Sequence, residues 1–165
     1  ELENGNFGDT IVRNFLYDSF NFLFYSALKN SNDETLAALA TKSLKEVKYH
    51  LRHSKNWLIR LGDGTEESNI KVQKALDNIW QYTSDLFEMD AIDLEMHDQK
   101  IGVNNAELKT KWDEIINLTL QEAKLNRPSD GYNASGGKKG IHTEYLGFLL
   151  AEMQFMQRSY PNAKW

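Results

Sequence analysis

One segment of the chain repeats apolar and small residues with the spacing of a long, packed helix. The repeating residues are Ala37, Ala40, Leu44, Val47, Leu51, Ser54, Leu58 and Leu61. Alternating spacings of three and four keep these residues on one face of an α-helix, as in long antiparallel bundles. The segment therefore predicts an all-α fold built from long helices.

The scarcity of proline supports this prediction. The sequence of 165 residues contains 2 prolines, Pro128 and Pro161. Residues 1–127 therefore lack the residue that most strongly interrupts a helix. We expect five helices, over about 9–29, 34–61, from 65 onward, 106–124 and 142–158. An irregular connector is expected over 88–105, and a long loop over 126–140.

The expected helix boundaries follow from short polar residues and glycine. Asp9, Asp33 and Thr65 are the expected N-caps, because such side chains accept hydrogen bonds from the free backbone N–H groups of a first turn. Gly62 is expected to end the second helix. With 41% hydrophobic residues, the chain can bury one core, so we expect a single domain over residues 1–165.

Charge and composition exclude several function classes. The formal net charge is -5 and the pI is about 5.4, which disfavours a nucleic-acid partner. There are 0 cysteines, so no disulfide or thiol nucleophile is available. The apolar run over 15–28 is interrupted by polar residues, and we expect no membrane role and a cytoplasmic location. The start at Glu1 does not resemble a signal peptide, and we expect an upstream part to be missing.

A helical bundle can hold two iron ions when two helices each give a carboxylate and two others give Glu-x-x-His. The nearest match places Asp18 on the first helix, and Glu46 and His50 on the second. However, Tyr49 occupies the third position after Glu46, and His50 comes one residue late. These three residues are therefore the metal candidates only if the chain is itself a metal-dependent oxidase.

A second interpretation of the same residues needs no metal. Asp18, Glu46 and His50 are then buried or half-buried groups that bond to one another, to Tyr49 or to Arg13. The sequence favours this interpretation, so we expect no metal ligand and no catalytic residue in this chain. His53, Leu39 and Trp57 lie on the same flank of the second helix. Trp57, Trp80 and Trp112 are expected in the core.

The glycine-rich part of the long loop contains two adjacent lysines, Lys138 and Lys139, between Gly136 and Gly140. Exposed backbone N–H groups, two positive charges and a following helix could hold a phosphate, such as one of coenzyme A. The alternative is a flexible docking loop, and the spacing does not match a Walker motif. Thr143 or His142 is expected to cap the helix that follows, with Glu144 in its first turn.

Four sequence blocks resemble a known family over essentially the whole chain. They are GDTIVR at 8–13, KEVKYHLR at 45–52 with LGDGT at 61–65, GGKKGIHTE at 136–144 and LAEMQFMQR at 150–158. In this order the blocks are similar to the structural C subunit of bacterial ring-1,2-phenylacetyl-CoA epoxidases.

The resemblance implies a ferritin-like helical bundle that acts as a non-catalytic structural subunit. It implies that a separate catalytic subunit holds a di-iron site and binds phenylacetyl-CoA, and that the structural subunit packs against it. The complex epoxidises the aromatic ring with dioxygen, and a reductase supplies electrons from NADPH. The implied partners are the catalytic subunit and the other epoxidase subunits, with self-association left open. Two further helices are implied before the first helix of this chain.

Overall fold

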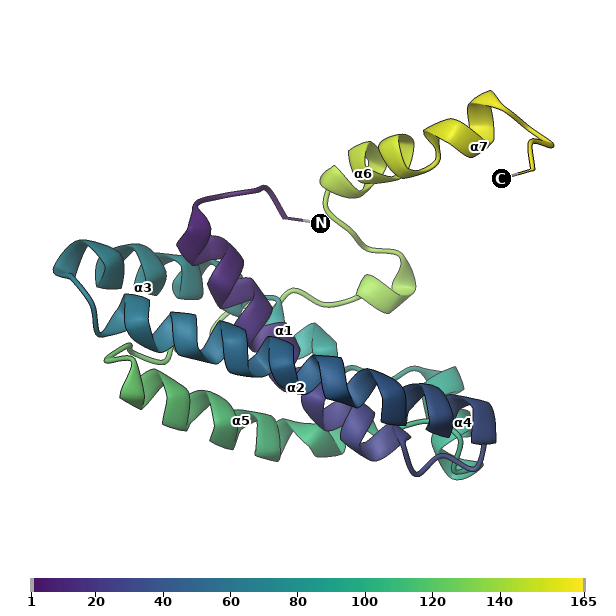
Figure 1. Cartoon of the computed structure of the whole chain (residues 1–165), viewed down its shortest axis with the longest axis horizontal. Helices are drawn as coiled ribbons and strands as arrows, with labels where there is room; N and C mark the ends of the chain where they lie inside the picture. The colour runs from purple at the N-terminus through teal and green to yellow at the C-terminus, as the bar shows by residue number, and fades with distance from the viewer. Residues whose placement is uncertain (1, 165) are drawn as a thin grey trace. The chain divides into compact units, whose positions relative to one another are not determined.

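The computed structural model describes residues 2–164, and within them every regular element is helical (Figure 1). The elements are α1 (Phe7–Leu28), α2 (Glu34–Gly62), α3 (Glu66–Trp80), the 3-10 helix η1 (Thr83–Phe87), α4 (Ala91–Asp98), α5 (Asn105–Glu122), the 3-10 helix η2 (Gly137–Lys139), α6 (Tyr145–Met153) and α7 (Phe155–Ser159). The predicted all-α fold is confirmed.

The contacts within the chain divide it into two compact units. The larger unit is Gly5–Ser135 and contains α1 to α5 as a helical bundle of ferritin-like type. The smaller unit includes residues 2–4 and 136–164, with η2, α6 and α7. Each unit is described by itself.

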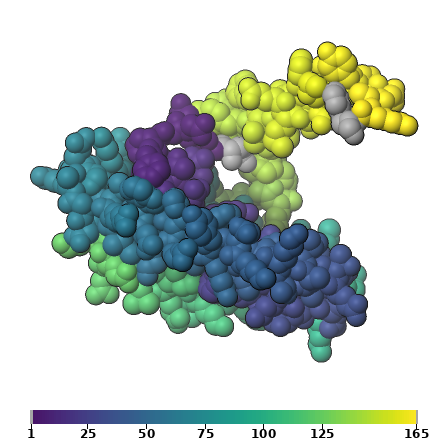
Figure 2. Space-filling view, in the orientation of Figure 1, coloured from purple at the N-terminus to yellow at the C-terminus, as the bar shows by residue number. Residues whose placement is uncertain are grey.

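Helix α1 is the central element of the larger unit. It contacts α2, α3 and α5, as the apolar residues on nearly all of its sides predict. Helix α2 follows α1 through a short turn and lies across the face that Figure 2 presents. Its predicted stripe faces inward, and Ala40, Leu44, Val47 and Leu58 are buried.

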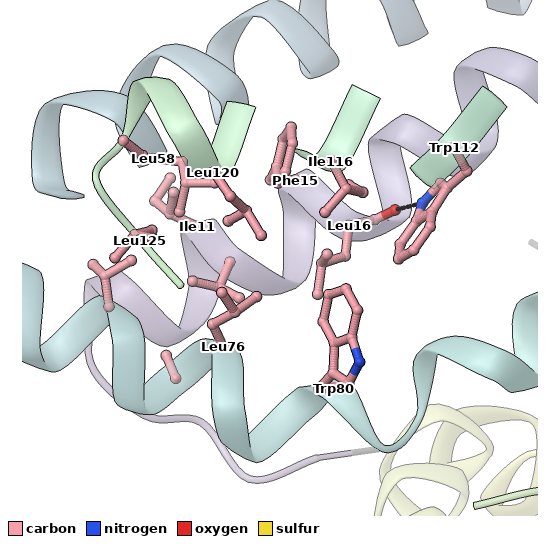
Figure 3. Close-up of a cluster of buried hydrophobic side chains, with 14 of the residues drawn as sticks. Ile11, Phe15, Leu16, Leu58, Leu76, Trp80, Trp112, Ile116, Leu120 and Leu125 are labelled. Atoms are coloured by element: carbon pink, nitrogen blue, oxygen red, sulfur yellow. Dashed lines mark hydrogen bonds between the residues drawn. The ribbon is translucent and has the colours of Figure 1, made fainter. Parts of the chain in front are cut away.

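The core lies between α1, α3 and α5 and includes Leu58 of α2 (Figure 3). Phe15, Leu76 and Ile116 are fully buried there, one each from α1, α3 and α5. Trp112 is 1% exposed, and its indole Nε1 donates a hydrogen bond to the Leu16 carbonyl oxygen over 3.0 Å. This bond satisfies the polar atom of a buried indole, and it fixes α5 against α1.

The predicted caps of the second and third helices are confirmed. Asp33 accepts a hydrogen bond from the Leu36 amide over 2.9 Å, and Thr65 accepts one from the Ser68 amide over 3.2 Å. The first helix begins earlier than expected. Asn6 is its N-cap, and Asp9 completes a capping box by accepting from the Asn6 amide over 2.7 Å.

Gly62 lies where α2 meets the end of α5. It is the last helical residue, and Asp63 is the C-cap. A methyl group at Gly62 would overlap the carbonyl oxygen of Ala123, so the close approach of the two backbones requires glycine. Asn69 reinforces this junction. Its side-chain Nδ2 donates to the Gly62 carbonyl over 2.7 Å and to the Lys124 carbonyl over 3.2 Å.

The expectation of an irregular connector over 88–105 is wrong, because this segment contains helix α4. Asp90 caps the helix by accepting from the Ile92 and Asp93 amides over 2.8 and 2.9 Å. The Asp93 carboxylate in turn accepts from the Asp90 amide over 2.9 Å. This reciprocal pair satisfies the free amides of the first turn and allows a short helix among acidic residues.

The last predicted helix differs from the structure at its start and in its middle. It begins at Tyr145, and its N-cap is Glu144, whose side chain makes no capping bond. The predicted capping by Thr143 or His142 is therefore wrong. At Gln154 the backbone bends and divides α6 from α7, although the Arg158 amide still donates to the Gln154 carbonyl over 3.0 Å.

The helices also bear on the question of membrane insertion. Among residues 2–164, each helix is too short or too polar to cross a bilayer.

Candidate functional site

Asp18 is a half-buried carboxylate at the contact of α1 with α2. Its Oδ2 atom accepts a hydrogen bond from the Ser54 hydroxyl over 2.7 Å. Ser54 is 1% exposed and lies on the inner face of α2. The bond therefore joins the polar side of α1 to the core stripe of α2.

Burial raises the pKa of Asp18 above its usual value of 3.8. The hydrogen bond from Ser54 and the nearby charges of His50 and His53 act in the opposite direction, but they do not cancel the effect of burial. Asp18 thus lies within electrostatic range of two histidines, and it holds its proton more tightly than an exposed aspartate does.

The three metal candidates are not brought together as a ligand set. Glu46 and His50 are both exposed on α2, whereas Asp18 is half-buried against Ser54. Across residues 2–164, no three carboxylate or imidazole side chains lie close enough to share a metal ion. Ser54 is a partner of Asp18 that the sequence did not predict, because it depends on how the two helices meet.

The two loop lysines occupy a tight turn in the smaller unit. Gly136 and Gly140 bound the turn in the left-handed conformation, with φ of 93° and 80°. Lys138 and Lys139 are exposed between them. Helix α6 begins five residues after Gly140, and its N-cap is the carboxylate-bearing Glu144. We expected the lysines to lie directly before a helix N-terminus. This expectation is wrong, because α6 begins several residues later along the chain.

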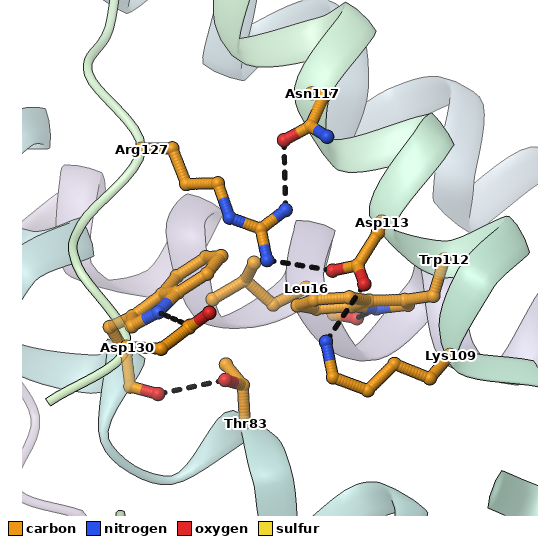
Figure 4. Close-up of polar contacts among 9 residues, drawn as sticks. Leu16, Thr83, Lys109, Trp112, Asp113, Asn117, Arg127 and Asp130 are labelled. Atoms are coloured by element: carbon orange, nitrogen blue, oxygen red, sulfur yellow. Dashed lines mark hydrogen bonds and ion pairs between the residues drawn. The ribbon is translucent and has the colours of Figure 1, made fainter. Parts of the chain in front are cut away.

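A polar network that the sequence did not predict joins the loop after α5 to the bundle (Figure 4). Arg127 donates to Asp113 Oδ1 over 2.7 Å and to Asn117 Oδ1 over 2.8 Å. Its guanidinium also lies over the Trp80 ring, 4.9 Å from the centroid. The Trp80 indole donates to Asp130 over 3.1 Å. The loop is thus held to the bundle at two successive points.

Asp113 is the centre of this network. Burial acts to raise its pKa, but hydrogen bonds from Lys109 and Arg127, together with their charges, lower it below 3.8. Lys109 bonds to the second carboxylate oxygen over 2.8 Å. The spacing of four residues between Lys109 and Asp113 on a helix is typical of an ion pair, so this contact could be predicted from the sequence. The partnership with Arg127, fourteen residues away, had no comparable signal.

Tyr49, His53 and Trp57 form an aromatic row on α2. The rings of Tyr49 and His53 are stacked with centroids 6.4 Å apart. Trp57 is half-buried and contacts the Phe7 ring edge-on, with centroids 5.3 Å apart. The expectation that Trp57, Trp80 and Trp112 are core residues is therefore confirmed for Trp80 and Trp112, which are 4% and 1% exposed. Trp57 is only partly buried, but it packs against the core.

Comparison with known proteins places the chain in a family. A family model described as phenylacetic acid catabolic protein matches residues 1–165. The chain is 42% identical over 165 residues to the C subunit of 1,2-phenylacetyl-CoA epoxidase from Escherichia coli (strain K12). The match includes 100% of this chain and 66% of that relative, so the chain spans just under two thirds of its length. This protein belongs to the phenylacetic acid catabolic protein family.

Proposed function

We propose that this protein is a non-catalytic structural subunit of a multicomponent phenylacetyl-CoA epoxidase in the cytoplasm. Its role is to dock and stabilise the di-iron catalytic subunit during aerobic phenylacetate breakdown. Family membership and the 42% identity to a relative named as an epoxidase subunit support the proposal. In this proposal the bundle and the C-terminal helices act together as one ferritin-like domain.

The single observation that carries the docking role is the exposed apolar surface of α6 and α7. Phe148, Met153 and Phe155 are 69%, 66% and 62% exposed. Leu149 and Met156, on other sides of the same helices, are 47% and 45% exposed. A short helix that exposes apolar side chains on more than one side is stable when another protein surface covers it. The catalytic subunit supplies this surface.

The proposal assigns the cofactors to other subunits. Iron is bound by the catalytic subunit, and the electrons come from NADPH through the reductase. Within this chain, Tyr49 occupies the position where a second metal ligand would follow Glu46, and Glu46 itself is exposed. These two observations support the assignment of the chemistry to the partner.

Co-purification of the intact protein with the catalytic subunit tests the docking role. We expect a stable complex at micromolar concentration. Replacing Phe148 and Met153 together by serine should weaken it at least about tenfold, because two exposed apolar anchors are lost. The matched control replaces Ile92 and Leu94, which are 68% and 51% exposed on α4. If the wild-type protein stays monomeric beside the catalytic subunit, the docking role is wrong.

A second candidate is a metal-dependent, di-iron oxidase that acts in its own right. It is favoured by the position of Asp18, whose carboxylate lies within electrostatic range of His50 and His53. Metal analysis of the intact protein decides between the two candidates. Less than about half an iron per chain would reject the second, because a bundle site of this kind holds two.

We further propose that Lys138 and Lys139 contact the phosphates of coenzyme A at the subunit boundary. Both lysines are exposed on a turn fixed by two left-handed glycines. Replacing both by alanine should raise the apparent KM of the complex for phenylacetyl-CoA at low salt and leave kcat unchanged. The control is the exposed pair Lys42 and Lys45 on α2. An unchanged KM would reject this contact.

A further inference from the structure

The outer face of α2 carries a cluster of aromatic and cationic side chains, of which Trp57 also packs against the bundle. We call this cluster the α2 patch; it consists of Tyr49, Arg52, His53, Asn56, Trp57 and Arg60. Together these residues line a shallow pocket of about 210 Å³. The helix that carries them forms part of the surface shown in Figure 2.

Each arginine of the α2 patch makes a cation–π contact with an aromatic ring of the same helix. The Arg52 guanidinium lies 5.4 Å from the Tyr49 ring centroid. The Arg60 guanidinium lies 5.7 Å from the Trp57 ring centroid. A guanidinium in a cation–π contact keeps its N–H donors, and these can bind a carboxylate through two hydrogen bonds.

These two positive charges are not neutralised by the described chain. Among residues 2–164, neither Arg52 nor Arg60 forms an ion pair, whereas Arg127 is paired with Asp113. The chain as a whole carries a net charge of -5. A pair of uncompensated arginines on an acidic protein is a local surface of the opposite sign, and it attracts negative charge.

The spacing of the arginines defines what fits the α2 patch. They are eight residues apart on one helix, which is about 12 Å along its axis. One carboxylate or one phosphate is too small to bridge that distance. Two carboxylates about two turns apart on a second helix match it, with an apolar side chain between them against the half-buried Trp57.

We propose that the α2 patch is the docking surface for an acidic helical segment of the catalytic subunit. This inference rests on the proposed function and adds the surface and the chemistry of recognition. The composition of the α2 patch supports it, because tryptophan, tyrosine and arginine are the residues that most often dominate the affinity of a protein interface. The apolar helices α6 and α7 are then a second, separate contact.

The test measures the affinity of the intact protein for the purified catalytic subunit by titration calorimetry. Replacing Arg52 and Arg60 together by glutamine should raise Kd at least about 30-fold, because two carboxylates lose their partners. The matched control replaces Lys74 and Lys111, which are exposed on α3 and α5, and removes the same charge. It should change Kd by less than about twofold. Circular dichroism confirms that each variant is folded.

The outcomes separate this inference from the proposed function. If the wild-type protein does not bind the catalytic subunit, both are wrong. If it binds and the Arg52 and Arg60 variant binds equally well, only the α2 patch is wrong. Phenylglyoxal labelling of the intact protein gives a second readout. We expect Arg52 to react in the protein alone and to be protected in the complex. Protection in the protein alone would show that another part of the chain covers the α2 patch, and would overturn the inference.

Discussion

Asp18 lies in an environment that favours its neutral form. Burial raises its pKa above 3.8, so the folded chain binds this proton more tightly than the unfolded chain does. The resulting stabilisation is fully present at low pH and is lost as the pH rises through the raised pKa. Above that pKa the ionised, half-buried carboxylate opposes folding.

Replacing Asp18 by asparagine should relieve this effect. Asparagine stays neutral and still accepts the hydrogen bond from Ser54, so the gain in the free energy of unfolding should be larger at pH 7 than at pH 3. Urea unfolding at both pH values measures it. Ser54→Ala should act in the opposite direction, because it removes a bond that lowers the pKa of Asp18. Equal changes at the two pH values would contradict the prediction.

Arg127 holds the loop after α5 by two hydrogen bonds and one stacking contact. Arg127→Met should lower the free energy of unfolding by about 1–2 kcal/mol at pH 7, because Asp113 loses a charged partner. Since the pKa of Asp113 is lowered, this loss should shrink as the pH falls through that pKa. Lys124→Met is the control. Its ion pair with Asp63 is exposed, so its effect should stay below about 0.5 kcal/mol.

Individual side chains were only partly predictable from the sequence. Local signals found Asp33 and Thr65 as caps, because a cap is decided by residues three positions apart. The same reasoning could not place Ser54 beside Asp18, since their contact depends on how two helices meet. It also placed Trp57 in the core, whereas Trp57 packs against the core from a flank of α2 and stays half-buried.

At the level of elements, the long helices were predictable and the short ones were not. The repeat along α2 and the lack of proline before residue 128 determine the first three helices. Helix α4 was missed because its eight residues bury no side chain fully and show no apolar stripe. The capping box of Asp90 and Asp93 stabilises it. This signal is hard to recognise in the sequence, because both residues lie in a run of acidic residues.

The junction of α2 with α5 depends on one glycine. Gly62→Ala should lower the free energy of unfolding by about 1–3 kcal/mol, because the added methyl group overlaps the Ala123 carbonyl and the two backbones must separate. Gly147 in α6 has open space around it. Gly147→Ala should instead raise the helix content by circular dichroism, as expected when a helical glycine becomes alanine. If Gly62→Ala left the free energy of unfolding unchanged, the two backbones at this junction would be able to move apart without cost.

For the whole molecule, the hydrophobic core comes from the larger unit. The cluster of buried residues extends from Ile11 to Leu125 and includes no described residue of α6 or α7. The family resemblance gave the bundle type, but it did not indicate that the contacts divide the chain near Gly136. That division depends on which residues are buried together. Helix periodicity shows which face of a helix is buried, but it does not predict which helices pack together.

Deleting residues 140–165 should leave the core intact. We expect the free energy of urea unfolding, followed by tryptophan fluorescence, to change by less than about 0.5 kcal/mol, because no buried core side chain is removed. The same deletion should weaken binding to the catalytic subunit if α6 and α7 form the apolar contact, and leave the contact through the α2 patch. A large loss of stability would instead assign these helices a role in folding.

The distribution of indole rings gives the protein a built-in optical assay. Trp80 and Trp112 lie in the core with ring centroids 5.9 Å apart, whereas Trp57 lies half-buried on the α2 patch. With Trp165 replaced by phenylalanine, acrylamide should quench the emission of Trp57 and spare that of the core pair. Docking of a partner on the α2 patch would then reduce the quenching of Trp57 by acrylamide. Unfolding would shift the emission of Trp80 and Trp112 to longer wavelength. One unlabelled sample thus reports partner binding and core integrity as separate signals.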